Sequence, residues 1–433
     1  MGTFSRLKQH RGFIILGLIT ILVALSGCTL GTRSILSIPT VDARATNETK
    51  ALFINLWTLA DTNQTLFGHQ DDTFFGVGWR DEPGRSDVRD VSGSYPAVYG
   101  WEIGDLELGV PNNLDGVPFD TMREKIIEGY RRGGVITISW HMNNPVTYES
   151  IGSDPDDPYP GRSWDRTPAV STILPGGSNH ALYRRWLDDF AEFAKSLTVS
   201  GVPWNEDEHL VPVIFRPFHE HNGSVFWWGG RNTTEADYIA LWQFTVQYLR
   251  DLRGVHNLLY AYSPDARFMR GRDSDLSFPD LDTFEAAYFY AYPGDNFVDV
   301  LGLDYYVNAY PIRRGVDDAL VGLVGFQSSL DYLVETSHGR NDLKIPALTE
   351  TGGQWWELPS SEIWWTEFLY RGLIGTRSSG GQVAWALTWR NWDAMNHAGP
   401  YPGHPSEDDF VKFKDRPMIH LEDEIPFNMY TWP

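Results

Sequence analysis

The chain has 433 residues, 42% of them hydrophobic and 21% charged, which is the composition of a globular protein and excludes general disorder, collagen and coiled coil. Its 35 Lys and Arg residues against 57 Asp and Glu residues give a net charge of −22, which disfavours nucleic acid as a partner because phosphate groups are repelled. The 18 Trp and 20 Tyr residues suit both core packing and platforms for ligands with apolar faces and hydroxyl edges, such as sugars. A single cysteine excludes an intrachain disulfide and a cysteine-based zinc site.

The first residues have the pattern of a bacterial export signal. A basic stretch precedes an apolar run at residues 12–24, which is short for a membrane span. Leu-Ser-Gly-Cys at residues 25–28 resembles the lipobox of bacterial lipoproteins, so residues 1–28 are predicted to be a lipoprotein signal peptide and Cys28 the lipidated residue. Residues 29–46 are then a tether. Thr29 stands where an Asp would resemble an inner-membrane retention signal, which favours the outer membrane; the alternative is an ordinary export signal or an uncleaved anchor.

Eight short apolar runs alternate with amphipathic segments along the rest of the chain. The runs lie at residues 66–69, 97–103, 135–140, 210–215, 257–262, 300–305, 345–349 and 383–389. Continuous apolar runs bounded by turn residues indicate strands buried on both faces, as in a parallel sheet. Helical periodicity is clear at residues 183–196, 235–252 and 361–373. The pattern predicts an α/β fold, a single (β/α)8 TIM barrel over residues 47–433, with long loops such as 150–177 at the C-terminal face of the strands.

Carboxylates, histidines and indoles collect where these strands end, which is the face that carries catalysis in barrel enzymes. No nucleotide motif accompanies them, so the pattern favours a polyol substrate. Glu220 follows the fourth run and Glu350 the seventh, and such a pair can flank a glycosidic bond, one as proton donor and one as nucleophile or base. The same rim offers His69, Gln70, Asp71, Asp72, Glu102, His141, Asn143, Arg216, His219, His221, Trp227, Trp228, Asp304, Tyr306, Trp389, Arg390 and Trp392.

The segment RPFHEHNGSVFWW at residues 216–228 resembles glycoside hydrolase family 26, whose commonest activity is endo-β-1,4-mannanase. FGHQDD at 67–72, YPAVYGWEIG at 95–104, SWH at 139–141, LDYY at 303–306, TETGG at 349–353 and TWRN at 388–391 continue the match in order. The resemblance implies a retaining (β/α)8 hydrolase with Glu220 as acid/base and Glu350 as nucleophile. The predicted substrate-binding residues are His141, Trp164, His219, Trp227, Tyr306, Trp389 and Arg390.

The resemblance predicts hydrolysis of internal β-1,4-mannosidic linkages of mannan, glucomannan or galactomannan by a monomer held at the outer membrane through its lipid anchor. A β-1,3-xylanase, a mixed-linkage β-glucanase and a non-catalytic glycan-binding lipoprotein are the alternatives. One departure from the family pattern is Val225, which stands where the family usually has Trp, near the leaving-group side. No cofactor and no metal are predicted, since His219 and His221 lie two residues apart without a third ligand at a recognisable spacing.

Two groups of residues carry open interpretations. Asp71 and Asp72 are either cleft residues or carboxylates that shape a loop. Four further indoles are either sugar platforms or core residues: Trp355, Trp356, Trp364 and Trp365.

Overall fold

The computed structural model describes residues 39–154, 156–269, 278, 280–307, 316–340, 342–353, 363–375 and 381–433, with the backbone alone for residues 307 and 316–321. Cys28, the signal peptide and residues 29–38 of the predicted tether lie outside the described residues, as do Trp355 and Trp356. No helix within the described ranges is long and apolar enough to cross a membrane.

Eight parallel strands close into a barrel. Each strand pairs with the next, and the last pairs back to the first, with Leu66 opposite Trp385. Most of these strands are buried along their whole length, as their unbroken apolar runs predict. The predicted (β/α)8 barrel is therefore confirmed. Its strands are β1 (Thr65–Gln70), β4 (Val98–Glu102), β5 (Val135–Trp140), β8 (Val213–Pro217), β9 (Leu258–Tyr262), β10 (Val300–Val307), β11 (Ile345–Gly353) and β12 (Trp385–Thr388).

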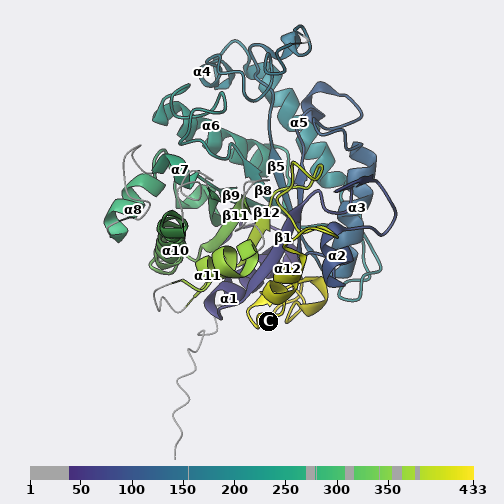
Figure 1. Ribbon diagram of the computed structural model, residues 1–433. Helices are drawn as coiled ribbons and strands as arrows, with labels where there is room; N and C mark the ends of the chain where they lie inside the picture. The colour runs from purple at the N-terminus through teal and green to yellow at the C-terminus, as the bar shows by residue number, and fades with distance from the viewer. Residues whose placement is uncertain are drawn as a thin grey trace, which may run out of the picture. The chain divides into compact units, whose positions relative to one another are not determined.

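Helices surround these strands (Figure 1). They are α1 (Asn47–Asp61), α2 (Asp87–Ser92), α3 (Phe119–Arg132), α4 (Val170–Ile173), α5 (His180–Ser196), α6 (Glu235–Gln247), α7 (Ala266–Met269), α8 (Leu281–Tyr288), α10 (Val316–His338), α11 (Arg371–Leu373) and α12 (Glu407–Lys414). A π-helical turn at Tyr248–Leu252 extends α6, and another at Trp365–Tyr370 precedes α11. Gly133 shows how a helix is ended: its φ of 102° stops α3 and turns the chain directly into β5.

Short strands lie outside the barrel wall. β2 (Phe75–Gly76) pairs with β3 (Trp79–Arg80), and β6 (Thr198–Val199) pairs with β7 (His209–Leu210), both antiparallel. β13 (Ile419–His420) pairs in parallel with Thr65 and Leu66 at the start of β1. Short 3-10 turns complete the loops at Leu106–Leu108, Tyr148–Ser150, Asp295–Phe297 and Glu422–Glu424.

The predicted boundaries differ from the structure at two strands. The fourth run was predicted from residue 210, but Leu210 belongs to β7 and the barrel strand starts after Pro212, which has no N–H for a sheet ladder. The seventh run was predicted to end before Glu350, but β11 continues to Gly353 and so carries Glu350 within the strand.

Residues 39–46 are part of the folded unit, which starts at Pro39. The backbone N–H of Val41 donates to Asp299 Oδ1 at 2.7 Å, and the ring of His256 pairs with Asp42 Oδ2 at 2.6 Å. Both partners lie close to the starts of β9 and β10. The part of the predicted tether that the structure describes is thus bound to the barrel rather than extended from it.

Candidate active site

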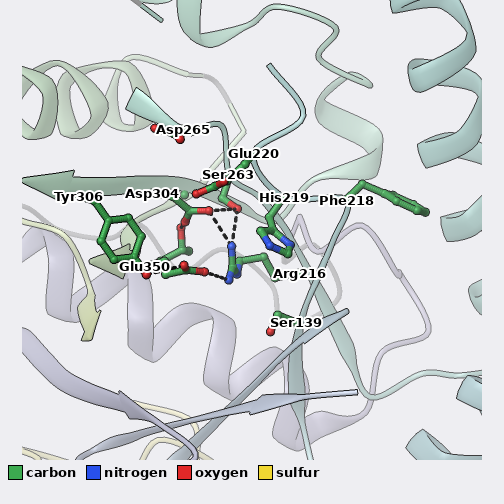
Figure 2. Close-up of polar contacts among 12 residues, drawn as sticks. Ser139, Arg216, Phe218, His219, Glu220, Ser263, Asp265, Asp304, Tyr306 and Glu350 are labelled. Carbon is green, nitrogen blue, oxygen red and sulfur yellow. Dashed lines mark hydrogen bonds and ion pairs between the residues drawn. The ribbon is translucent and has the colours of Figure 1, made fainter. Parts of the chain in front are cut away.

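The ends of β8, β10 and β11 place one arginine between two carboxylates. Arg216 on β8 forms an ion pair with Glu350 on β11, and its Nη1 donates to Asp304 Oδ2 on β10 at 2.7 Å (Figure 2). The hydroxyl of Tyr306 donates to the other oxygen of Glu350 at 2.6 Å. Each oxygen of Glu350 therefore faces a donor, the arrangement that suits a carboxylate acting as a nucleophile.

Glu220 lies in the loop directly after β8 and has an unusual backbone. Its φ is 52°, and the φ of Phe218 two residues earlier is 49°, both in the left-handed region that non-glycine residues rarely adopt. The N–H of Glu220 donates to the carbonyl of Ser263 at 2.9 Å, which holds this conformation against the end of β9. Residues held in this way cluster at functional sites, because the surrounding structure must stabilise them.

The surroundings of Glu220 favour its protonated form. Burial raises the pKa of Glu220 well above its ordinary value, and the charges of Asp265, Glu350 and Asp304 raise it further. Arg267 opposes this effect from 3.5 Å, but its guanidinium is also paired with Asp265. A protonated carboxyl near an accepting carboxylate is the division of roles that glycosidases use.

Two histidines form a chain beside this pair. His141 Nδ1 contacts Glu102 Oε2 at 2.7 Å, and His141 Nε2 lies 3.2 Å from His219 Nε2. Burial lowers the pKa of His141, but the adjacent Glu102 carboxylate outweighs it and leaves that pKa raised. Burial, Arg216 and His141 together lower the pKa of His219 well below its usual value. These opposite shifts favour His141 as the donor and His219 as the acceptor in this contact.

Aromatic rings surround His141. Trp164 stacks on it with ring centres 5.7 Å apart, and Trp389 meets it edge-on at 5.9 Å. Phe226 contacts the same imidazole at 5.3 Å. Trp164 comes from the long loop predicted at 150–177, where Asp165 accepts hydrogen bonds from Thr147 and from the backbone at residue 161. Rings that converge on a polar centre suit a sugar, with its apolar faces and hydroxyl edges.

A pocket of about 530 Å³ opens beside Glu350. Arg390 forms part of its wall and is fixed by an ion pair between its Nη2 and Asp115 Oδ1 at 2.8 Å. The pocket lining consists of Arg267, Tyr306, Glu350, Trp389, Arg390, Trp392, Met395, Asn396, His397 and Ala398.

Comparison with known proteins places this geometry in a family. The model of glycosyl hydrolase family 26 matches residues 41–354. The chain belongs to this family. A mannan endo-1,4-β-mannosidase from Bifidobacterium adolescentis is 30% identical over 400 residues, which cover 89% of this chain and 36% of the relative. A similar enzyme from Bacillus subtilis is 28% identical over 52% of this chain and 55% of its own length. The chain thus spans about a third to a half of the length of these two relatives.

Solved structures show the same barrel. A family 26 β-mannanase from Bacteroides ovatus is 37% identical and superposes with a TM-score of 0.74 over 89% of this chain and 98% of its own. A modular endo-β-1,4-mannanase from Cellulomonas fimi is 32% identical with a TM-score of 0.72, over 91% of this chain and 79% of its own. The family resemblance and the barrel predicted from the sequence are both confirmed.

Most of the predicted site residues of this family 26 chain lie together, but Trp227 does not join them. Its side chain is 0% exposed and its indole N–H donates to the carbonyl of Met142 at 2.9 Å, so it is a core residue and not a sugar platform. Phe226 takes the position beside His141. Trp364 and Trp365 are also buried, which resolves their open interpretation in favour of the core.

Several residues of the site were not foreseen from the sequence. Asp115 and Arg267 lie in loops that have no periodic sequence pattern. Only the structure shows that Asp115 pairs with Arg390 and that Arg267 lies beside Glu220. Asp72 contacts His69 Nδ1 at 2.8 Å inside the protein and so shapes the loop after β1, and Asp71 is fully buried. In the described part of the chain, no three His, Cys, Asp or Glu side chains group in a way that would hold a metal ion.

Proposed function

We propose that the protein is a retaining β-mannanase that cleaves internal β-1,4-mannosidic linkages of mannan, glucomannan or galactomannan. The observation that carries this proposal is the asymmetry between Glu220, whose raised pKa favours a proton, and Glu350, whose two oxygens face the donors Arg216 and Tyr306. The choice of mannan is supported by the relatives, which are mannan endo-1,4-β-mannosidases and β-mannanases.

In the first step, the Glu350 carboxylate attacks the anomeric carbon while Glu220 gives its proton to the leaving oxygen. The glycosidic bond breaks, and an ester between the sugar and Glu350 forms. Arg216 and the Tyr306 hydroxyl hold the attacking carboxylate in place. In the second step, Glu220, now ionised, takes a proton from water. The water oxygen attacks the anomeric carbon and frees Glu350.

The neighbouring residues position the sugar in this scheme. His141 and His219 offer polar groups, and Trp164, Tyr306 and Trp389 offer ring faces and edges around the same point. Arg390 offers a fixed cation further along the pocket, held by Asp115. Val225 lies half-buried where the family pattern usually has Trp, so we infer weaker contacts on the leaving-group side.

Reducing-sugar release from mannan, β-1,3-xylan and lichenan, measured side by side, tests the proposal. We expect release from mannan that is lost in Glu350→Ala. Preferential release from xylan or lichenan would reassign the substrate within the enzyme class. Binding of mannan without release of reducing sugar would show that the protein is a glycan-binding protein and not an enzyme.

We also propose that the protein is exported and lipid-anchored at the outer membrane through Cys28. The lipobox-like Leu-Ser-Gly-Cys after an apolar run supports this, and no second cysteine in the sequence could serve the same purpose. The enzyme would then act outside the cytoplasm, on mannan chains that are too large to enter the cell.

A further inference from the structure

The loop after β9 is fastened to the loop that carries Glu220. The side-chain amide of Asn222 donates to the carbonyl of Asp265 at 2.9 Å, and its amide oxygen accepts from the N–H of Asp265, also at 2.9 Å. The ring of Phe268 packs on Gly223, where an added Cβ atom would lie 2.6 Å from the ring. These contacts hold the short helix α7 against the loop of Glu220.

Arg267 on α7 reaches Glu220 from this position. Its backbone N–H donates to Asp265 Oδ1 at 2.7 Å and its Nε donates to Asp265 Oδ2 at 2.6 Å, so Asp265 orients the guanidinium group. The Nη2 atom of Arg267 then lies 3.5 Å from Glu220 Oε1. In the described part of the chain, Arg267 is the one cation that forms an ion pair with Glu220, since Arg216 pairs with the carboxylates on β10 and β11.

Charged and titratable groups act on Glu220 from the ends of four strands. Burial and three carboxylates disfavour its ionised form, whereas Arg267 favours that form. Burial lowers the pKa of His219 well below its usual value and the pKa of His221 to about 4, so neither ring carries charge near neutral pH. The groups around Glu220, several of which Figure 2 shows, are Arg216 on β8, His219 and His221 beside Glu220, Asp265 and Arg267 after β9, Asp304 and Tyr306 on β10, and Glu350 on β11.

The proposed reaction needs Glu220 in both of its protonation states. In the first step Glu220 gives its proton to the leaving oxygen, and in the second step it must be ionised to take a proton from water. When Glu350 becomes an ester, its negative charge is lost, and Arg267 then opposes one carboxylate fewer. The ion pair with Arg267 is therefore strongest relative to the opposing charges in the glycosyl enzyme, where Glu220 is a carboxylate.

We propose that Arg267 is a positioning residue that stabilises the Glu220 carboxylate in the glycosyl enzyme and so assists the second step, in which water attacks. The guanidinium group stays protonated throughout and forms no covalent bond. The proton of the attacking water passes to Glu220, the water oxygen bonds to the anomeric carbon, and the ester bond to Glu350 breaks. This inference rests on the proposed function, because it assigns a task within the same double displacement.

The test compares the two steps in Arg267→Gln, which removes the charge. With an aryl β-mannobioside whose leaving group needs no proton, the second step limits kcat. This kcat should fall about tenfold below neutral pH and its acidic limb should move up by about one pH unit, the lower end for an opposite charge at this distance because the Arg267 side chain is 32% exposed. For mannohexaose, kcat/KM reports the first step and should fall less than about twofold. Its basic limb should also move up, because Glu220 keeps its proton to higher pH.

Three controls separate this role from a structural one. Azide attacks the glycosyl enzyme without a base and should restore the turnover of Arg267→Gln on the aryl substrate. Arg267→Lys keeps a cation and should keep most of the wild-type rate and both pH profiles. Arg253→Gln is the matched control, since the Arg253 side chain is also 32% exposed and pairs with Asp188, away from Glu220, so both profiles should stay as in the wild type.

Two outcomes overturn the role of Arg267 without touching the proposed function. One is an equal loss on both substrates in Arg267→Gln, with both pH profiles unchanged and no rescue by azide, which would make Arg267 a structural residue. The other is wild-type kinetics in this variant. Arg267→Met also lacks the charge and gives the same reading if Arg267→Gln does not fold. A wild type that cleaves neither the aryl β-mannobioside nor mannohexaose overturns the proposed function itself.

Discussion

Glu220 and Glu350 are the same residue type in different surroundings, and those surroundings support the different roles that we propose for them. Glu220 is buried beside Asp265 and Asp304, so charge on it is disfavoured. Glu350 faces Arg216 and Tyr306, so its oxygens are met by donors. The sequence suggests these roles only through the family resemblance, and the surroundings of the two carboxyl groups give them a physical reason.

Removal of each glutamate should therefore have a different consequence. Glu220→Ala should still form the glycosyl intermediate from an aryl mannoside with a good leaving group, and azide should restore its turnover. On mannan, which needs the proton, this variant should lose about 10²–10⁴-fold in kcat. Glu350→Ala should be inactive on both substrates, with or without azide. Steady-state rates on the two substrates measure this, and equal losses without azide rescue in Glu220→Ala would refute the assignment.

Glu102 should control the charge of His141, because its carboxylate contacts the imidazole at 2.7 Å and raises the pKa of that ring. Glu102→Gln should lower the pKa of His141, read from the ring resonances by NMR titration. Ser139→Ala is the matched control. It removes the hydrogen bond that Ser139 donates to Glu102 at 2.8 Å but keeps the Glu102 carboxylate, so the pKa of His141 should stay closer to the wild-type value. An unchanged pKa in Glu102→Gln would show that other groups hold the imidazolium.

At the scale of the elements, the eight strands could be predicted because each is a continuous apolar run buried on both faces. The rim residues on those strands, such as Glu102 and Arg216, were placed by the same rule. Trp227 was misassigned because FWW lies in a loop, where no period indicates which ring points inward. Asp115 and Arg267 were missed because a loop carboxylate or guanidinium acquires its role from a partner distant in sequence, Arg390 in one case and Glu220 in the other.

The loop after β4 contains a buried carboxyl group, that of Glu107, whose hydrogen bonds hold neighbouring residues in place. Glu107 accepts hydrogen bonds from Trp140 at 3.0 Å and from the backbone of Asn143 at 2.8 Å, and burial raises its pKa from 4.5 to about 7. Because the pKa is higher in the folded state, the stability linked to this group is complete below the unfolded pKa of 4.5 and is lost as the pH rises through 7. The full loss is up to about 3 kcal/mol.

Glu107→Gln should accordingly reduce the fall in the free energy of unfolding between pH 5 and pH 8. Denaturant titrations of both proteins at the two pH values measure it. The difference between the two proteins isolates Glu107 from Asp299, a buried carboxyl whose pKa of about 6 acts in the same direction. An identical fall in both proteins would show that Glu107 does not titrate in this range.

At the scale of the whole molecule, we propose that a lipid anchor at Cys28 determines where the acidic barrel works. Cys28→Ser should leave the mannanase activity of the barrel intact and change its cellular location, because each buried methylene of an acyl chain contributes about 0.8 kcal/mol to membrane binding. Fractionation of cells producing each form, with labelled palmitate, tests this. If both forms fractionate alike and the wild type takes up no palmitate, the segment is an ordinary export signal.

We propose that Glu220 and Glu350 together hydrolyse a β-mannosidic bond by double displacement. Proton NMR of the anomers formed in the first minutes of mannohexaose cleavage tests it most directly, since both the substrate and the stereochemistry are read in one spectrum. Two successive inversions at the anomeric carbon predict that the β-anomer appears first and then mutarotates. An initial α-anomer would mean a single displacement by water, and would contradict Glu350 as the nucleophile.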